Sequence, residues 1–332
     1  MFDAIDCQDR CAVIVPYKDC SEVLSKCLDS LLKVLPDSAS VVLIDDGSKL
    51  EASVDPKLQA FLQDPHVCCL RHLENRGPAA ARNTGVRWCW EQGIELVILL
   101  DSDCLVGPGF VETHCALHQQ YPDVVCIGGA IHGIGKGLWA KLDGLMSWFT
   151  SVPNSEMRDV AGVYHIPTTN MSIKLNLSSR NFPLFENRLK TGEDVVFCKR
   201  LQSDGGKILF SPNPEIRHLD RTSFRGFLRH QYRWGLHTYV VRFGDRNWGI
   251  AKRLILALSF IFLLPAYALL ASLINVLPWL KQSFLFLKYY PLILIVYLIK
   301  GFAVIEGICF PNTALYPSNF TPTLASEKLI DT

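Results

Sequence analysis

The first 130 residues of this chain alternate short apolar runs with segments of helical periodicity, and this rhythm restricts the fold more than any other feature. The apolar runs read "AVIVP", "SVVLI", "VCCLRH", "ELVILL" and "VVCIGG". Strands that are apolar along their whole length are typical of a parallel sheet covered by helices on both faces. Ligands of such sheets bind beyond the carboxyl ends of the strands. We therefore expect an α/β fold whose functional residues lie where these strands end.

Three of the predicted strands end in polar residues, which read "PYKD", "DDGS" and "DSD". In the last of these, Asp101 and Asp103 are two residues apart where a buried strand turns into a loop, so both carboxylates can face one cavity. Such a pair suits a hard divalent cation, because Mg²⁺ and Mn²⁺ prefer oxygen ligands. Two alternatives remain open at this point. "DSD" could cap the helix that begins near Pro108, and the Asp-Gly pair of "DDGS" is also strong turn chemistry.

Two long apolar segments near the C-terminal end predict membrane helices. Leu254 to Leu280 contains no charged residue and exceeds the roughly 20 residues that cross a bilayer. The second segment, 284–310, is interrupted by Lys288, Lys300 and Glu306. We expect the two lysines to snorkel from the ends of a short span. A re-entrant or interfacial helix is the alternative, so the prediction is one span or a hairpin.

The charges that flank the first span predict its orientation. Basic residues precede it at Arg242, Arg246, Lys252 and Arg253, and fewer follow it, at Lys281 and Lys288. The positive-inside rule therefore places the large N-terminal region in the cytoplasm. The segment "MFDAIDCQDR" predicts no signal peptide, and the twelve cysteines form no Cys-x-x-Cys pair, which favours a reducing compartment. A formal net charge of +1 gives no field that would attract nucleic acid.

Six motifs, in order, carry a resemblance to a known family: "VIVPYKD", "LIDDGS", "NRGPAAARNTG", "LLDSD", "TTNMSIK" and "GEDVVFCKRLQSDGGKI". From about Cys11 to Gly235 the chain resembles the family-2 glycosyltransferases with a GT-A fold. The resemblance implies a mostly parallel sheet with helices on both faces, here followed by C-terminal transmembrane helices. It also implies transfer of a sugar from a nucleotide-diphosphate donor, usually with inversion and with Mg²⁺ or Mn²⁺.

The resemblance divides the chain into segments with expected roles. Residues 1–248 would form the catalytic domain, with a nucleotide-binding half at 11–130 and an acceptor and catalytic half at 131–248. Residues 249–312 would form the transmembrane helix or hairpin, and 313–332 a C-terminal tail. The stripe in "GKGLWAKLDGLMSWF" could lie on a membrane surface or pack in the core.

The resemblance also assigns roles to individual residues. The base that takes the acceptor proton would be Asp194, with Glu193 orienting the acceptor or the loop, although an acidic first turn of a helix is favoured by the helix dipole anyway. Metal ligands would be Asp101, Asp103 and His218. The nucleotide and the donor sugar would be bound by Pro16, Tyr17, Asp19, Asp45, Asp46, Arg76, Arg82, Asp101, Ser102, Asn170, Arg233 and Trp234.

One departure bears on the type of transfer. Processive members of the family carry Gln-x-x-Arg-Trp, and this chain has His230 in place of the glutamine while it keeps Arg233 and Trp234. Two apolar helices follow the catalytic region, whereas polymer synthases thread their product through many spans. Single-sugar transfer is therefore expected rather than polymer synthesis.

The expected function is that of an inverting glycosyltransferase at the cytoplasmic membrane face, which uses a UDP-sugar and a lipid or lipid-linked acceptor. One alternative is a transferase that modifies a cell-surface polysaccharide intermediate. Another is a catalytically lapsed membrane protein that binds nucleotide sugars. A dinucleotide-dependent oxidoreductase would need a Gly-x-Gly-x-x-Gly after the first strand, where this chain reads "PYKDCS".

Overall fold

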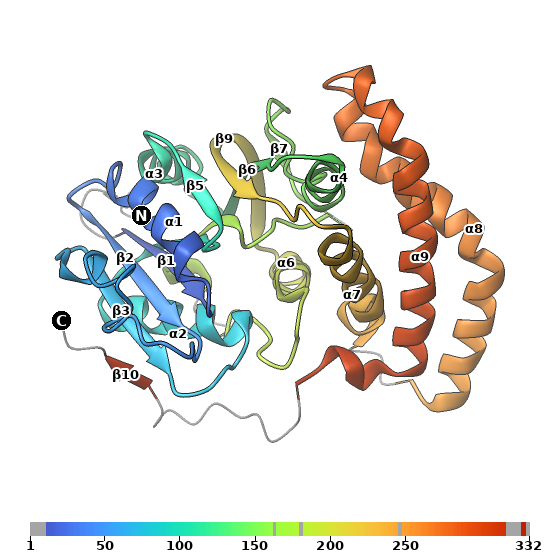
Figure 1. Ribbon diagram of the computed structural model, residues 1–332, viewed down its shortest axis with the longest axis horizontal. Coiled ribbons are helices and arrows are strands. Elements are labelled where there is room, and N and C mark those ends of the chain that lie inside the picture. The colour runs from blue at the N-terminus through green and yellow to red at the C-terminus, as the bar shows by residue number, and fades with distance from the viewer. Residues whose placement is uncertain (1–10, 162–163, 179–181, 245–247, 317–326, 330–332) are drawn as a thin grey trace.

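A computed structural model describes residues 11–161, 164–178, 182–244, 248–316 and 327–329. It consists of a mixed ten-stranded sheet with helices on both faces and a group of long helices at one end (Figure 1). The strand order along the sheet is β10-β3-β2-β1-β4-β8-β6-β9-β5, and β7 pairs with β9. The predicted absence of a signal peptide and the predicted flanking charge of Arg246 concern positions outside the described residues.

The first half of the sheet is parallel, as the strand–helix rhythm predicts. Its strands are β3 (Val67–His72), β2 (Ala39–Asp45), β1 (Cys11–Tyr17) and β4 (Leu96–Leu100). Their side chains alternate between two cores. Val13 and Ile98 pack with α1 (Ser21–Leu32) on one face, and Ile14 and Val97 pack with α2 (Pro78–Glu91) on the other. Complete burial of each such side chain contributes about 1.5–3 kcal/mol.

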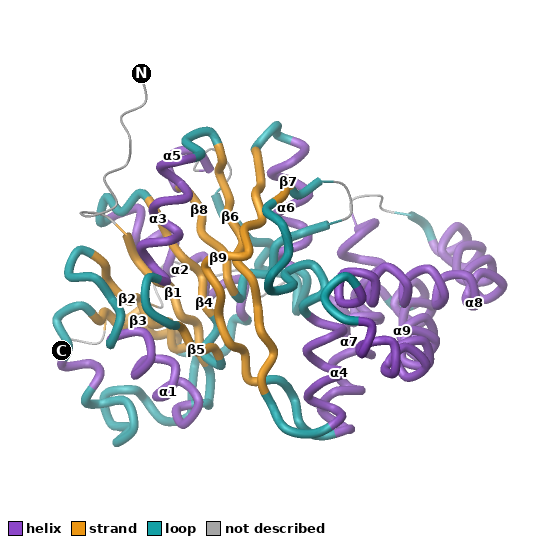
Figure 2. Tube along the Cα trace, turned by 90° about the horizontal axis from the view of Figure 1, so that it is seen from above, coloured by secondary structure: helices purple, strands orange, loops and turns teal. Residues whose placement is uncertain are grey.

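The second half of the sheet is mixed, which the rhythm of apolar runs does not predict. Strand β8 (Asn170–Lys174) lies antiparallel between β4 and β6 (Val124–Ile134), and β9 (Lys207–Leu219) runs parallel to β6. The short β5 (Cys104–Val106) pairs antiparallel with β9. The remaining elements here are α3 (Phe110–Gln120), α4 (Leu138–Ser147), β7 (Arg158–Asp159), α5 (Leu175–Ser178) and α6 (Glu193–Ser203). Figure 2 shows these strands side by side across the molecule.

Strand register in the mixed half brings distant polar residues to the end of β4. Leu100 pairs with Asn170, so Thr169 lies beside Asp101. Cys104 pairs with His218, so that histidine lies beside Asp103. Thr169 and Asp101 are 68 positions apart in the sequence, and His218 and Asp103 are more than 100 positions apart. The mixed half of the sheet therefore completes a site that the parallel half begins.

Asn170 is a structural residue, which contradicts its predicted contact with the donor. Its side chain is fully buried, and its amide donates to the carbonyl oxygens of Ala130 at 3.0 Å and Pro214 at 3.1 Å. Its Oδ1 atom lies 3.0 Å from Nε2 of His114. Alternation along β8 places Asn170 and Ser172 on the same face of the sheet, where both contact His114 of α3.

Three long helices form the C-terminal part: α7 (Phe224–Phe243), α8 (Ile250–Leu280) and α9 (Tyr290–Cys309). Helix α9 packs between α7 and α8 (Figure 1). Glycines permit the closest approach, since a Cβ on Gly235 would lie 2.4 Å from the carbonyl oxygen of Lys300. A Cβ on Gly307 would lie 1.9 Å from the carbonyl oxygen of Leu236. Helix α7 is therefore held against α9 at backbone distance.

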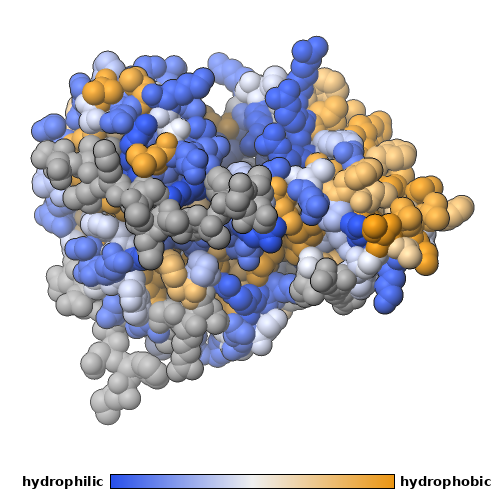
Figure 3. All heavy atoms as spheres, turned by 90° about the horizontal axis from the view of Figure 1, so that it is seen from below, coloured by the Kyte–Doolittle hydropathy of each residue, from blue (hydrophilic) through white to orange (hydrophobic). Residues whose placement is uncertain are grey.

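Helix α8 and the segment from Phe284 to Cys309 are long and apolar enough to cross a membrane. Helix α8 continues through Pro265 and exposes large apolar side chains, among them Ile255 at 65% and Phe262 at 84%. Figure 3 shows apolar side chains gathered at this end of the molecule. The stripe on α4 is not part of that surface, because Leu142 and Met146 are buried against α7, α8 and α9.

The chain returns to the catalytic body after α9. A short 3₁₀ helix at Pro311–Ala314 leads to Leu315, which forms a β-bridge with Leu189. The Tyr316 amide then donates to the carbonyl oxygen of Arg188 at 2.8 Å. Strand β10 (Glu327–Leu329) pairs antiparallel with β3. The hairpin formed by α8 and α9 is thus attached to the sheet domain at both of its ends.

We expect Asn170→Ala to lower the stability of the protein without removing a ligand contact. The change leaves two buried carbonyl oxygens and His114 without their partner, and each such loss costs about 1–3 kcal/mol. The melting temperature of the detergent-solubilised full chain should fall by several degrees relative to Gln63→Ala, which alters an exposed side chain. An unchanged melting temperature would contradict the structural role.

Candidate active site

A cavity of about 690 Å³ opens at the carboxyl ends of β1 and β4. The sheet supplies one wall, the start of α6 lies at its centre, and α7 with α9 forms the opposite wall. Of the residues predicted to bind the donor or the metal, or to act in catalysis, those that line it are Pro16, Tyr17, Asp46, Arg82, Asp101, Ser102, Asp103, Glu193, Asp194, His218, Arg233 and Trp234. Most of the sequence-predicted site is therefore assembled in one place.

The Arg82 guanidinium is the central ionic contact of the cavity. It donates to Oδ1 of Asp101 and to Oε1 of Glu193, each at 2.6 Å. Thr169 donates to the other oxygen of Asp101 at 2.7 Å. Burial alone would lower the pKa of Arg82, but the charges of Asp101 and Glu193 raise it. The guanidinium therefore stays charged and joins the end of β4 to the first turn of α6.

Asp194 is the carboxylate best suited to accept a proton. Burial raises its pKa to about 6, although a hydrogen bond from the Val195 amide to Oδ1, 2.8 Å long, acts in the opposite direction. Its Oδ2 atom lies 3.8 Å from Nε2 of His165. Burial also raises the pKa of Glu193, where Arg82 partly opposes the shift. The two adjacent carboxylates thus differ in role, since Glu193 is tied to Arg82 and Asp194 faces the cavity.

Asp103 and His218 form the part of the site that could hold a divalent cation. Nε2 of His218 lies 3.3 Å from Oδ1 of Asp103, and its Nδ1 lies 2.9 Å from Asp220. Burial would lower the pKa of His218, but Asp103 and Asp220 raise it to about 10. Among the described residues, no three His, Cys, Asp or Glu side chains are grouped as a metal site.

The fit of these residues to a metal therefore depends on the substrate. Mg²⁺ and Mn²⁺ sites in nucleotide enzymes commonly use one or two protein ligands together with substrate phosphates. Asp103 and His218 meet that requirement, with Asp220 fixing the ring orientation of the histidine. Asp101, the other predicted ligand, has its oxygens directed at Arg82 and Thr169 instead.

The "DDGS" turn contributes to the site through one aspartate. Asp46 borders the cavity and accepts hydrogen bonds from the amides of Arg76 and Gly77, each at 2.8 Å. Asp45 instead pairs with Arg71 and accepts from the Ser48 amide, inside the turn. Asp46 thus fixes the loop that leads into α2.

Three residues predicted to contact the donor have side chains that do not line the cavity: Asp19, Asp45 and Arg76. Asp19 lies at the surface, where it accepts from the Lys49 amide and pairs with Lys18 at 3.2 Å. Arg76 is buried beside the loop that its own amide helps to fix. Sequence proximity to a strand end does not decide which way a side chain points.

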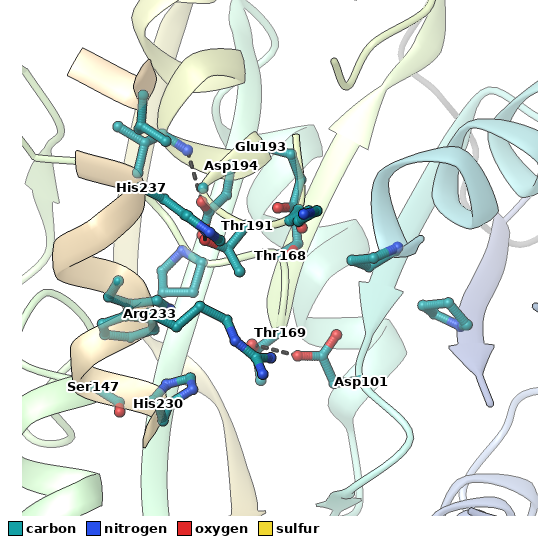
Figure 4. A pocket seen from close by; sticks show the side chains of 18 of the residues that line it. Asp101, Ser147, Thr168, Thr169, Thr191, Glu193, Asp194, His230, Arg233 and His237 are labelled. Atoms are coloured by element: carbon teal, nitrogen blue, oxygen red, sulfur yellow. Dashed lines mark hydrogen bonds between the residues drawn. The ribbon is translucent and has the colours of Figure 1, made fainter. Parts of the chain in front are cut away.

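Several lining residues were not predicted from the sequence. They come from the loops before β8 and α6, from the loop after β9, and from α7, α9 and the C-terminal return, and are His165, Thr168, Thr169, Lys190, Arg221, His237, Arg242, Lys300 and Tyr316. Figure 4 shows Arg233 reaching toward Asp101 and Thr169, with His237 beside Thr191. The predicted snorkelling of Lys300 is wrong, because this side chain faces the cavity. The sequence does contain a signal that Lys300 belongs to a functional site, namely a charged residue within an apolar helix, because such residues commonly mark functional sites.

Comparison with known proteins agrees with this geometry. Residues 12–172 match the family described as Glycosyl transferase family 2. A pre-mycofactocin glycosyltransferase of Mycobacterium tuberculosis is 25% identical over 232 residues, which cover 67% of this chain and 45% of that protein. The succinoglycan biosynthesis protein ExoO of Rhizobium meliloti is 25% identical over 249 residues, or 68% of this chain and 65% of ExoO. The chain spans less than half the length of the first of these relatives.

Solved structures with a similar fold include two GT-A proteins. The mannosyltransferase PcManGT from Pyrobaculum calidifontis, in complex with GDP-Man and Mn²⁺, has a TM-score of 0.56 at 16% identity. This similarity covers 90% of this chain and 87% of PcManGT. GalNAc-T7 with UDP, GalNAc and Mn²⁺ has a TM-score of 0.50 at 19% identity, over 70% of this chain and 51% of that one. The expected GT-A fold is thereby confirmed.

We expect Arg82→Met to destabilise the protein strongly, because it leaves the buried Glu193 and the partly buried Asp101 without their cation. Loss of one partner from a buried ionic network costs about 3–5 kcal/mol. The melting temperature should recover partly in the double variant Arg82→Met with Glu193→Gln, which removes one of the orphaned charges. If the double variant is less stable than the single one, Arg82 does not act by charge compensation.

Proposed function

Because residues 12–172 form a family-2 glycosyltransferase domain, we propose that this chain is a membrane-anchored inverting glycosyltransferase with a lipid or lipid-linked acceptor. Its donor would be a nucleotide-diphosphate sugar. The observation that carries the proposal is the position of Asp194. A cavity-facing carboxylate with a raised pKa shares one cavity with the Asp103–His218 pair, so a proton acceptor and a candidate diphosphate site lie together.

The proposed donor site follows from the lining residues. Pro16, Tyr17 and Asp46 border the end of the cavity formed by β1 and β2, which suits the nucleoside. Arg233 extends from α7 toward Asp101, where its guanidinium can contact a diphosphate (Figure 4). Uridine is our expectation for the base. The similar structures contain UDP in one case and GDP-mannose in the other, so the donor screen below includes both nucleotides.

A divalent cation fits this proposal at Asp103 and His218. Mg²⁺ or Mn²⁺ bound there would offset the negative charge of the departing diphosphate. Asp220 would keep Nε2 of His218 directed at the cation through its contact with Nδ1. Asp101 would serve the donor sugar or ribose, or act through Arg82 and Thr169, rather than bind the cation.

The residues of the chain can be assigned roles in transfer. Asp194 takes the proton of an acceptor hydroxyl as its oxygen bonds to the anomeric carbon, on the face opposite the diphosphate. The bond from that carbon to the diphosphate oxygen breaks, and the nucleoside diphosphate leaves with the electron pair. Attack from the opposite face inverts the anomeric centre. Arg82 holds Glu193 so that the first turn of α6 keeps Asp194 in place.

The two apolar helices next to the cavity favour a lipid acceptor. The exposed apolar side chains of α8 would be covered by lipid, and α9, which packs against α8, forms part of the cavity wall. The basic residues before α8 favour a cytoplasmic catalytic domain. A catalytically lapsed binding protein would not need an intact Asp194, and a transferase acting on a polysaccharide intermediate would use the same cavity.

The proposal predicts turnover of a nucleotide sugar by the purified full chain. A panel of UDP- and GDP-sugars should include at least one donor that releases nucleoside diphosphate with Mn²⁺ present and stops doing so in excess chelator. Asp194→Asn should lower this rate by about 100-fold or more while nucleotide binding persists, because proton transfer alone contributes that much. Absence of release from every donor would refute the enzyme assignment.

The raised pKa of Asp194 predicts an acid limb in the pH–rate profile. Below pH 6 this carboxyl carries a proton and cannot accept one, so kcat/KM should fall about tenfold per pH unit and level off above about pH 7. The stability of the protein should change in the opposite direction to its activity. Because the pKa of Asp194 is higher in the folded state than in the unfolded state, ionisation of this carboxyl lowers the free energy of unfolding as the pH rises from about 4 to 6. A flat profile between pH 4.5 and 7 would exclude Asp194 as the base.

A further inference from the structure

The side chain of Lys300 reaches the cavity beside Gly235 of α7, a position that has no side chain to block it. Lys300 lies on α9, and its side chain passes over Gly235, where a Cβ would be 3.0 Å from Cγ of Lys300. The same missing Cβ allows the backbone of Lys300 to contact α7 directly. Any larger residue at position 235 would occupy the path of the lysine, so the two positions fit each other. The ammonium group is thereby delivered from a predicted membrane helix into the cavity.

The surroundings of this ammonium group are aromatic and cationic. Its Nζ atom lies 5.1 Å from the centre of the Trp234 ring and 5.3 Å from that of Tyr297. No carboxylate of the described residues lies within ion-pair distance of Lys300. Ring faces attract a cation, but they do not neutralise it. The pocket is therefore arranged to hold a positive charge that an incoming anion could satisfy.

Neighbouring groups extend this positive region toward Asp194. Burial together with the charges of Arg242 and Lys300 lowers the pKa of His165 to about 3. His165 in turn lies 3.8 Å from Asp194. Arg233, in contrast, points toward Asp101 on the donor side (Figure 4). The cavity therefore contains Arg233 near Asp101 and a second pair of cations, Lys300 and Arg242, whose charges act on His165 beside Asp194.

We propose that Lys300, with Arg242 beside it, forms an anion subsite that binds the phosphate of a lipid-linked acceptor. A donor diphosphate is already provided for by Asp103, His218 and Arg233. The second cationic region lies on the wall formed by the predicted membrane helix, where a lipid phosphate would arrive. Trp234 and Tyr297 would flank that phosphate and exclude water from the contact.

This inference rests on the proposed function and specifies its acceptor. With the phosphate held at Lys300, the hydroxyl of the attached group is left for Asp194. The hydroxyl oxygen forms the bond to the anomeric carbon, its proton goes to Asp194, and the diphosphate leaves with the electrons of the broken bond. Lys300 touches neither reacting atom and acts by positioning the acceptor.

The test uses the full chain in a neutral detergent and measures binding of decyl phosphate, decanol and inorganic phosphate. The wild type should bind decyl phosphate about tenfold or more tightly than decanol, because a charge-assisted hydrogen bond gives that difference. Lys300→Met should abolish the preference, and Lys300→Arg should retain it. Binding of nucleoside diphosphate with Mn²⁺ should be equal in all three proteins.

Each other outcome overturns part of the inference. A preference for decyl phosphate that survives Lys300→Met places the anion elsewhere. A loss of nucleotide binding in Lys300→Met would assign Lys300 to the donor, and equal binding of inorganic and decyl phosphate would exclude the lipid. Failure of the proposed function is separate. In that case no donor is turned over by the wild type, although the lysine-dependent preference for decyl phosphate is present.

Discussion

The contact of Arg82 with Asp101 and Glu193 is the interaction on which the rest of the site depends. It connects three elements that the chain places far apart, namely α2, the end of β4 and the start of α6. A buried guanidinium needs its partners, and two buried carboxylates need theirs, so none of the three elements can shift alone. Asp194 follows Glu193 directly and therefore takes its position from this contact.

The cavity is closed from the other side by α7 and α9, and α9 belongs to a segment long and apolar enough to cross a membrane. Close packing at Gly235 and Gly307 fixes α7 against α9, and α7 carries Arg233 and Trp234. The two walls thus have different supports, since the sheet holds most of the donor residues, whereas α9 supports α7, which carries Arg233. A change in the packing of α9 would therefore alter the wall that α7 and α9 form.

The sequence predicted the residues whose position follows from local chain geometry. Asp101, Asp103 and Arg82 belong to strand ends and a helix start in the parallel half, and Asp194 opens a helix. The structure departs from the expected arrangement where side-chain direction decides the outcome. Asn170 points to the face of the sheet that carries His114, and Asp45 closes its own turn. No local pattern distinguishes these from residues that face the cavity.

The residues that were not predicted depend on the path of the chain through space. Thr169 reaches Asp101 only because β8 enters the sheet antiparallel beside β4, which the rhythm of apolar runs does not reveal. Lys300 reaches the cavity because a glycine on another helix leaves room for it. Tyr316 lines the cavity because the chain folds back after α9. Pairings of this kind are properties of the assembled fold.

That return of the chain has a mechanical consequence. The hairpin of α8 and α9 is fastened to the catalytic body at its beginning through α7 and at its end through the bridge between Leu315 and Leu189. In the proposed membrane-anchored enzyme, a body attached at one point could rotate over the bilayer, whereas attachment at two points would hold it at a fixed height and tilt. The cavity would then accept those acceptors whose reactive group lies at a matching distance from the membrane.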